Sequence, residues 1–173
     1  GTRENAAKSC AEIFVERPDL GSGHYWLDDD KQQGTYQPFE AFCQKKGNTI
    51  ITWVKRSGTV LYYMRNEATV EQYKECVNNG NGSCSDNNFL SGSLGQGEGG
   101  CNYLDAPSFL RRFDFPMNCV NYDGAAEFCS WVGGILPTED EWLDEASVSD
   151  ARPTPWGGLV STCGRVVMSA GSI

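Results

Sequence analysis

Residues 117–142 read MNCVNYDGAAEFCSWVGGILPTEDEW, and this stretch decides how the chain folds. It predicts a helix over 123–132, with Asp123 as its amino-terminal cap and small or apolar residues recurring on one face. A pair of glycines ends that helix. A further helix is predicted to begin after Thr138, which forms a capping box with Glu141. The stretch therefore predicts two consecutive helices separated by a glycine turn.

The other predicted elements surround this pair. They are a helix capped by Ser9, a helix capped by Thr69, and strands over 24–27, 36–42, 49–54 and 59–64. Phe39 and Phe42 are expected to point inward. Residues 1–58 form one unit by pattern, so we predict two domains, a small β-rich module over 1–58 and a second domain over 59–173. The predicted fold class is α+β.

Eight cysteines are spread along the 173 residues, and no two of them form a CxxC pair. The chain has one histidine, His24, so a zinc cluster is poorly supported. An even number of dispersed cysteines is typical of disulfides in an oxidising compartment, and we predict a secreted, extracellular protein. The cysteines expected to form disulfides are Cys10, Cys43, Cys76, Cys84, Cys101, Cys119, Cys129 and Cys163.

Charge and motifs exclude several functions. The net charge of −9 disfavours nucleic-acid binding, and no apolar run is long enough to span a membrane. Asp28, Asp29 and Asp30 lack the spacing of a calcium loop. Glu139 and Glu141 lie two residues apart on a helix, so capping is favoured over a catalytic pair. We predict no metal and no cofactor.

The sequon beginning at Asn81 predicts glycosylation of that residue.

The stretch 117–142 resembles the hallmark segment of the formylglycine-generating enzymes, which are sulfatase-modifying factors. Pro155-Trp156-Gly157 is similar to the family's "YPWG", and 67–73 is similar to its "EVT-x-x-QY" helix. The resemblance extends over about residues 59–170. It implies a variant of the C-type-lectin fold, present here as the amino-terminal part of a domain.

The departures from this family bear on activity. The resemblance implies that its enzymes bind copper through two cysteines near the end of the domain, and that they oxidise a substrate cysteine. Ile173 comes before any such segment, and none of the eight cysteines corresponds to that pair. We therefore assign no catalytic residue, and a non-enzymatic role is favoured. The alternative is a fragment of a copper-dependent oxidase whose catalytic cysteines lie beyond Ile173.

The resemblances also imply disulfide pairs. Cys129 matches a structural cysteine of the family, and Cys163 is its candidate partner; Cys76–Cys119 and Cys84–Cys101 are then expected for the rest. Residues 9–43 are similar to the start of fibrinogen-related domains, in which the two cysteines pair, so Cys10–Cys43 is implied. The segment is a truncated module, to which no ligand-binding activity carries over.

These observations predict a non-catalytic extracellular module for recognition, adhesion or assembly into a larger structure. A protein partner or self-assembly is expected, and a glycan is a second candidate ligand. The residues expected to face the missing layer of the domain, and hence a partner, include Trp131, Trp142 and Trp156.

Overall fold

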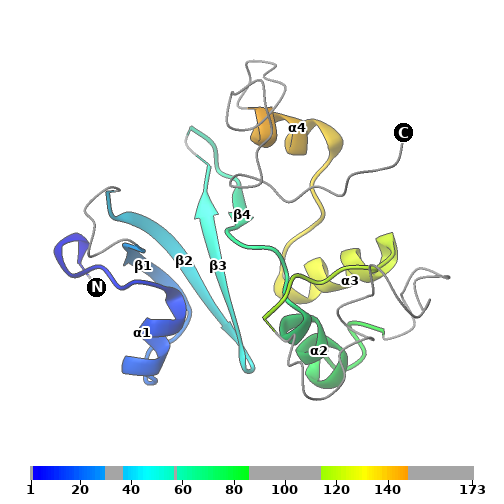
Figure 1. Ribbon diagram of the computed structural model, residues 1–173, viewed down its shortest axis with the longest axis horizontal. Coiled ribbons are helices and arrows are strands. Elements are labelled where there is room, and N and C mark those ends of the chain that lie inside the picture. Colours follow the sequence, from blue (N-terminus) through cyan, green and yellow to red (C-terminus); the bar gives the residue numbers. More distant parts are fainter. Residues whose placement is uncertain (1, 30–36, 57, 86–113, 148–173) are drawn as a thin grey trace. The chain divides into compact units, whose positions relative to one another are not determined.

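The computed structural model describes residues 2–29, 37–56, 58–85 and 114–147 (Figure 1). The chain divides into two compact units, Gly1–Gly134 and Ile135–Ile173. Helices and one antiparallel sheet confirm the predicted α+β class. The described elements in chain order are η1 (Arg3–Asn5), α1 (Cys10–Glu16), β1 (Gly23–Leu27), β2 (Phe39–Lys46), β3 (Thr49–Lys55), β4 (Tyr62–Met64), α2 (Val70–Asn79), α3 (Tyr122–Val132) and α4 (Glu139–Ser147).

The sheet has the strand order β1-β2-β3-β4, and every pair is antiparallel. β2 and β3 are joined by a tight turn in which Gly47 adopts a φ of 58°, a conformation that a residue with a Cβ resists. β4 pairs with β3 through Trp53 and Met64. The sheet therefore continues across the predicted domain boundary between residues 58 and 59.

One face of the sheet packs against α1. Ser9 caps this helix as predicted, since its hydroxyl accepts a hydrogen bond from the N–H of Glu12 at 3.1 Å. The disulfide Cys10–Cys43 joins α1 to β2, with 5.4 Å between the Cα atoms. The core on this side consists of Cys10, Ile13, Phe14, Leu27, Ala41 and Cys43.

α2 and α3 supply a second core, which lies against β3 (Figure 1). Thr69 caps α2 in a complete capping box with Gln72, as the sequence predicted. The cap of α3 is Asn121 rather than Asp123, so this helix begins two residues earlier than expected. The buried residues of this core are Ile51, Tyr73, Cys76, Cys84, Phe128, Trp131 and Val132.

The two predicted inward phenylalanines lie on opposite faces. Phe39 packs against the α1 core, whereas Phe42 pairs with His24 and Trp53 on the other face. Residues three apart on a strand must point in opposite directions, because side chains alternate with a period of two. Both side chains are half-buried, and each face of the sheet carries a core, so the expectation that both point inward stays a prediction.

The second unit contains α4. Thr138 caps the helix: its hydroxyl accepts from the N–H of Glu141 at 3.2 Å, and its own N–H donates to the Glu141 carboxylate at 2.8 Å. The Thr138 N–H, and second its hydroxyl at 2.9 Å, donate to the Glu141 carboxylate and hold the pKa of that group below its usual value. The predicted capping box is thus confirmed. None of the helices in the described ranges has the length and apolarity needed to cross a membrane.

Candidate functional site

Cys76, on α2, pairs with a different cysteine from the one predicted. Cys76 is bonded to Cys84, eight residues later, with 5.5 Å between the Cα atoms. α2 ends at Asn79, and the turn that follows returns the chain over the last helical turn. This short return brings Cys84 to Cys76, so the predicted pairs Cys76–Cys119 and Cys84–Cys101 were wrong. Cys101 itself lies outside the described residues.

Cys119 and Cys129 have different chemical states. Cys119 is also disulfide-bonded, and its partner is not among the described residues. Cys129, on α3, is a free thiol, so the expected pair with Cys163 is not formed. Burial raises the pKa of the Cys129 thiol, which keeps this side chain protonated at neutral pH. Cys163 lies outside the described residues.

This set of cysteines does not fit the copper site that the family resemblance implies. Soft thiolate ligands held close together are what copper(I) selects. In the described ranges, no group of three or more histidine, cysteine or acidic side chains could hold a metal ion. Cys129 is a single thiol whose anionic form is disfavoured by burial. The described residues therefore supply no thiolate pair for oxidation chemistry.

Trp131 is placed differently from the expectation that it faces a partner. It is 7% exposed and packs in the second core against Phe128, with ring centroids 5.8 Å apart. The ammonium of Lys46 lies 5.3 Å from the centre of its ring. Trp131 is thus covered by its own unit, because β2 and α2 close over the face of α3 that carries it.

Side chains of β2 also fix the carboxyl end of α3. The Gln44 amide donates to the carbonyl of Val132 at 3.0 Å, and Lys46 donates to the carbonyl of Trp131. The Gln44 side chain in turn accepts from the indole N–H of Trp53 at 2.8 Å. Helix ends leave carbonyl groups without intrahelical partners, and these long-range bonds satisfy two of them.

The other two tryptophans expected to face a partner lie in the second unit. Trp142 is on α4 and is 59% exposed. Trp156 is outside the described residues. Their expected partner-facing role stays a prediction.

An open part of the sheet carries a group of aromatic rings, which we call the aromatic face and define as His24, Trp26, Phe42 and Tyr62. His24 pairs with Phe42, and their ring centroids are 5.2 Å apart. Tyr62 comes from β4, the opposite edge strand, yet its ring lies 6.1 Å from that of His24. The rings of His24, Phe42 and Tyr62 therefore lie close together across the sheet, and Trp26 is two residues from His24 on the same face of β1.

Charged groups border the aromatic face. The Glu40 carboxylate lies 3.9 Å from Nδ1 of His24, and both side chains are about half exposed or more. The guanidinium of Arg3 lies 5.6 Å from the centre of the Trp26 ring. Lys55 is exposed at the end of β3. In this group His24 and Tyr62 are exposed, whereas Trp26 and Phe42 are half-buried. Aromatic rings with a charged border are typical of protein interfaces.

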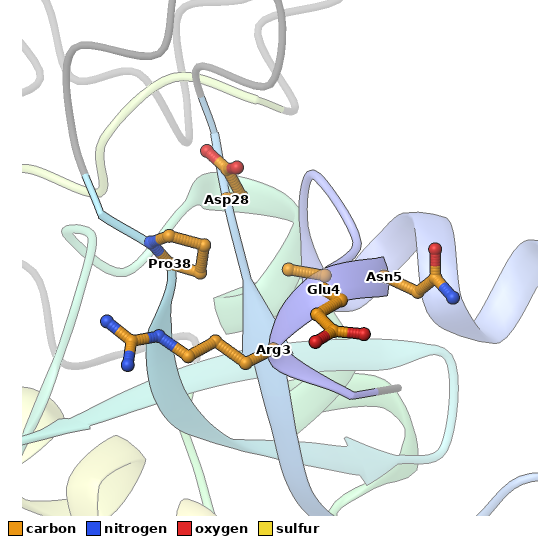
Figure 2. A pocket seen from close by; sticks show the side chains of 6 residues that line it. Arg3, Glu4, Asn5, Asp28 and Pro38 are labelled. Carbon is orange, nitrogen blue, oxygen red and sulfur yellow. The ribbon is translucent and has the colours of Figure 1, made fainter.

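A polar pocket of about 370 Å³ lies near the amino terminus (Figure 2). Arg3, Glu4 and Asn5 come from η1, whereas Asp28 follows β1 and Pro38 precedes β2. One positive and two negative side chains line it, and no nucleophile is paired with a base there. The pocket therefore offers polar contacts but no recognisable catalytic group.

Sequence reasoning missed the aromatic face because it depends on strand register. The spacing of His24 and Trp26, two residues apart in one predicted strand, was a signal that these side chains share one face. The signal could not say which face the helices would leave open.

Comparison with known proteins gives one family match. The model of the sulfatase-modifying factor enzyme 1-like domain matches residues 30–165, which is more than half of the chain. No curated protein and no solved structure matches the chain significantly. The family resemblance is thus confirmed, and the match begins upstream of the boundary expected at residue 59. The fibrinogen-related segment and the C-type-lectin-like fold stay predictions.

Proposed function

The chain belongs to the family of sulfatase-modifying factor enzyme 1-like domains, and we propose that it acts as a non-catalytic module for recognition and assembly. The observation that carries the proposal is the state of the cysteines. Four are consumed by Cys10–Cys43 and Cys76–Cys84, and Cys119 is bonded as well. The remaining described cysteine, Cys129, is a single thiol with a raised pKa.

A thiol that takes part in oxidation chemistry needs a lowered pKa, whereas the pKa of the Cys129 thiol is raised. Reactive cysteines have depressed pKa values, because neighbouring positive charge or hydrogen bonds favour the thiolate. Burial without such a partner favours the neutral form of Cys129 instead. We therefore assign Cys129 a packing role. The alternative, a fragment of a copper-dependent oxidase, is not favoured by any described residue.

An activity assay with a peptide substrate tests whether the chain is non-catalytic. The full chain is incubated with copper(I) and a peptide containing Cys-x-Pro-x-Arg, and aldehyde is captured with a hydrazide probe. Copper and peptide without protein give the background. We expect no aldehyde above background. Aldehyde above background with the wild-type chain would overturn the proposal, and Cys129→Ser would then show whether that thiol takes part.

The aromatic face is our candidate for the contact surface. It offers aromatic rings for burial and places Glu40 and Lys55 beside them, with opposite charges. A second copy of the same surface can complement this pattern, because each carboxylate can meet the ammonium group of the other chain. We therefore propose self-assembly through this face. The disulfides are compatible with an extracellular location for the assembly.

Light scattering over a range of concentrations tests the assembly. The wild-type chain is expected to form oligomers, and Tyr62→Ser is expected to weaken the association at least tenfold. Val15→Ser is the matched control, since Val15 is 79% exposed on α1, away from the aromatic face. A wild-type chain that stays monomeric at every concentration, or a Val15→Ser variant that weakens association equally, would contradict the proposed surface.

A further inference from the structure

We propose that Asn81 carries an N-linked glycan in the mature protein. Asn81, Gly82 and Ser83 form the one Asn-x-Ser/Thr sequon of the chain, with glycine rather than proline in the middle. All three residues are exposed. A sequon alone is a weak signal, so its position in the fold decides whether a glycan can be accommodated.

The sequon is at the tip of a turn whose base is fixed. Cys76 and Cys84 close the loop around it, and both are buried. Beyond the disulfide, Ser85 is held twice: its carbonyl accepts from the Tyr73 hydroxyl at 3.1 Å, and its N–H donates to the Glu127 carboxylate at 3.0 Å. The protein core thus ends at the base of the turn, and the tip points into solvent.

The backbone is tightly packed at the base of this turn and open at its tip. At Gly80 an added Cβ would lie 2.2 Å from the carbonyl oxygen of Cys76, so this position is tightly packed. At Gly82 an added Cβ would meet nothing within 4 Å. Asn81 itself has a φ of 52°, a left-handed conformation that asparagine tolerates in turns. A bulky polar group on Asn81 therefore displaces no packed side chain.

The modification is a group transfer from a lipid-linked oligosaccharide diphosphate. The amide nitrogen of Asn81 forms a bond to the anomeric carbon of the first sugar, and the bond from that carbon to the diphosphate oxygen breaks. The diphosphate leaves with the bonding electron pair, and the amide loses one proton. No oxidant or metal-bound residue of this chain takes part in the transfer.

Peptide mapping of the secreted chain tests the site. The full chain is produced with a secretion leader in eukaryotic cells and digested with and without an amidase that releases N-glycans. We expect the wild-type peptide containing Asn81 to carry sugar and to become aspartate at that position after release. An unmodified Asn81 in the secreted wild-type protein would overturn the proposal, and this measurement needs no variant.

Variants separate the sequon from general effects on folding. Asn81→Gln and Ser83→Ala are expected to lose the glycan completely, whereas Ser83→Thr is expected to retain it. Asn79→Gln is the matched control, since Asn79 is a neighbouring exposed asparagine outside any sequon. A glycan that persists in Asn81→Gln would contradict the assignment. Asn81→Gln should leave self-assembly unchanged, so this test is independent of the proposed contact surface.

Discussion

Gln44 links the sheet to the end of α3, and its replacement by methionine measures that link. The amide bonds to Val132, which is 88 positions away in the sequence, and to Trp53 on the neighbouring strand. Methionine keeps the volume of the side chain but neither donates nor accepts strongly. The substitution therefore leaves the Val132 carbonyl and the Trp53 indole without this partner.

The expected loss of stability follows from those two bonds. Each neutral hydrogen bond contributes about 1 kcal/mol net, so Gln44→Met should lower the free energy of unfolding by about 2 kcal/mol. In a Trp53→Phe background only the bond to Val132 remains to be lost, and the same substitution should cost about 1 kcal/mol. The difference between the two backgrounds is the coupling between Gln44 and Trp53.

Urea unfolding followed by far-ultraviolet circular dichroism gives these free energies without relying on tryptophan emission. Val15→Ser is the control, since Val15 is 79% exposed on α1, away from the Gln44 bonds and from the aromatic face, and the substitution should change stability by less than about 0.5 kcal/mol. Two results would refute the reasoning: a loss below about 0.5 kcal/mol for Gln44→Met, or an equal loss in both backgrounds.

Three further predictions concern the disulfide of the first core, the free thiol and a helix end. Replacing both Cys10 and Cys43 by serine opens a loop with a separation of 33 residues and should lower the unfolding free energy by about 4 kcal/mol in urea titrations. Burial raises the pKa of Cys129 in the folded chain above its value in the unfolded chain. The unfolding free energy that depends on this thiol is therefore fully present below the unfolded pKa and is lost as the pH rises through the folded pKa. Cys129→Ala should remove this loss from the alkaline part of a profile of unfolding free energy against pH. Gly133 ends α3 with a φ of 86°, so Gly133→Ala should cost about 1 kcal/mol of unfolding free energy, and Gly133→Asn should cost less.

The helix starts were determined by the sequence. Ser9, Thr69 and Thr138 each accept a hydrogen bond from the N–H three residues later, as their positions predicted. Such bonds form within one turn of the chain, so the local sequence carries the signal for them. The cap of α3 is the exception, because Asn121 and Asp123 are both good caps and the local sequence does not choose between them. The family could also be recognised at this level, since its hallmark is a continuous stretch.

Tertiary structure decided the pairing of the cysteines and the burial of Trp131. Cys76 had several partners available in the sequence, and only the return of the chain after α2 selected Cys84. Trp131 lies on a helix that could have presented it outward, yet β2 covers it with Lys46 and secures the helix end with Gln44. These outcomes depend on contacts between segments some 85 to 88 residues apart. A local pattern fixes which side chains share a face, but only the packing of distant segments fixes whether that face is covered.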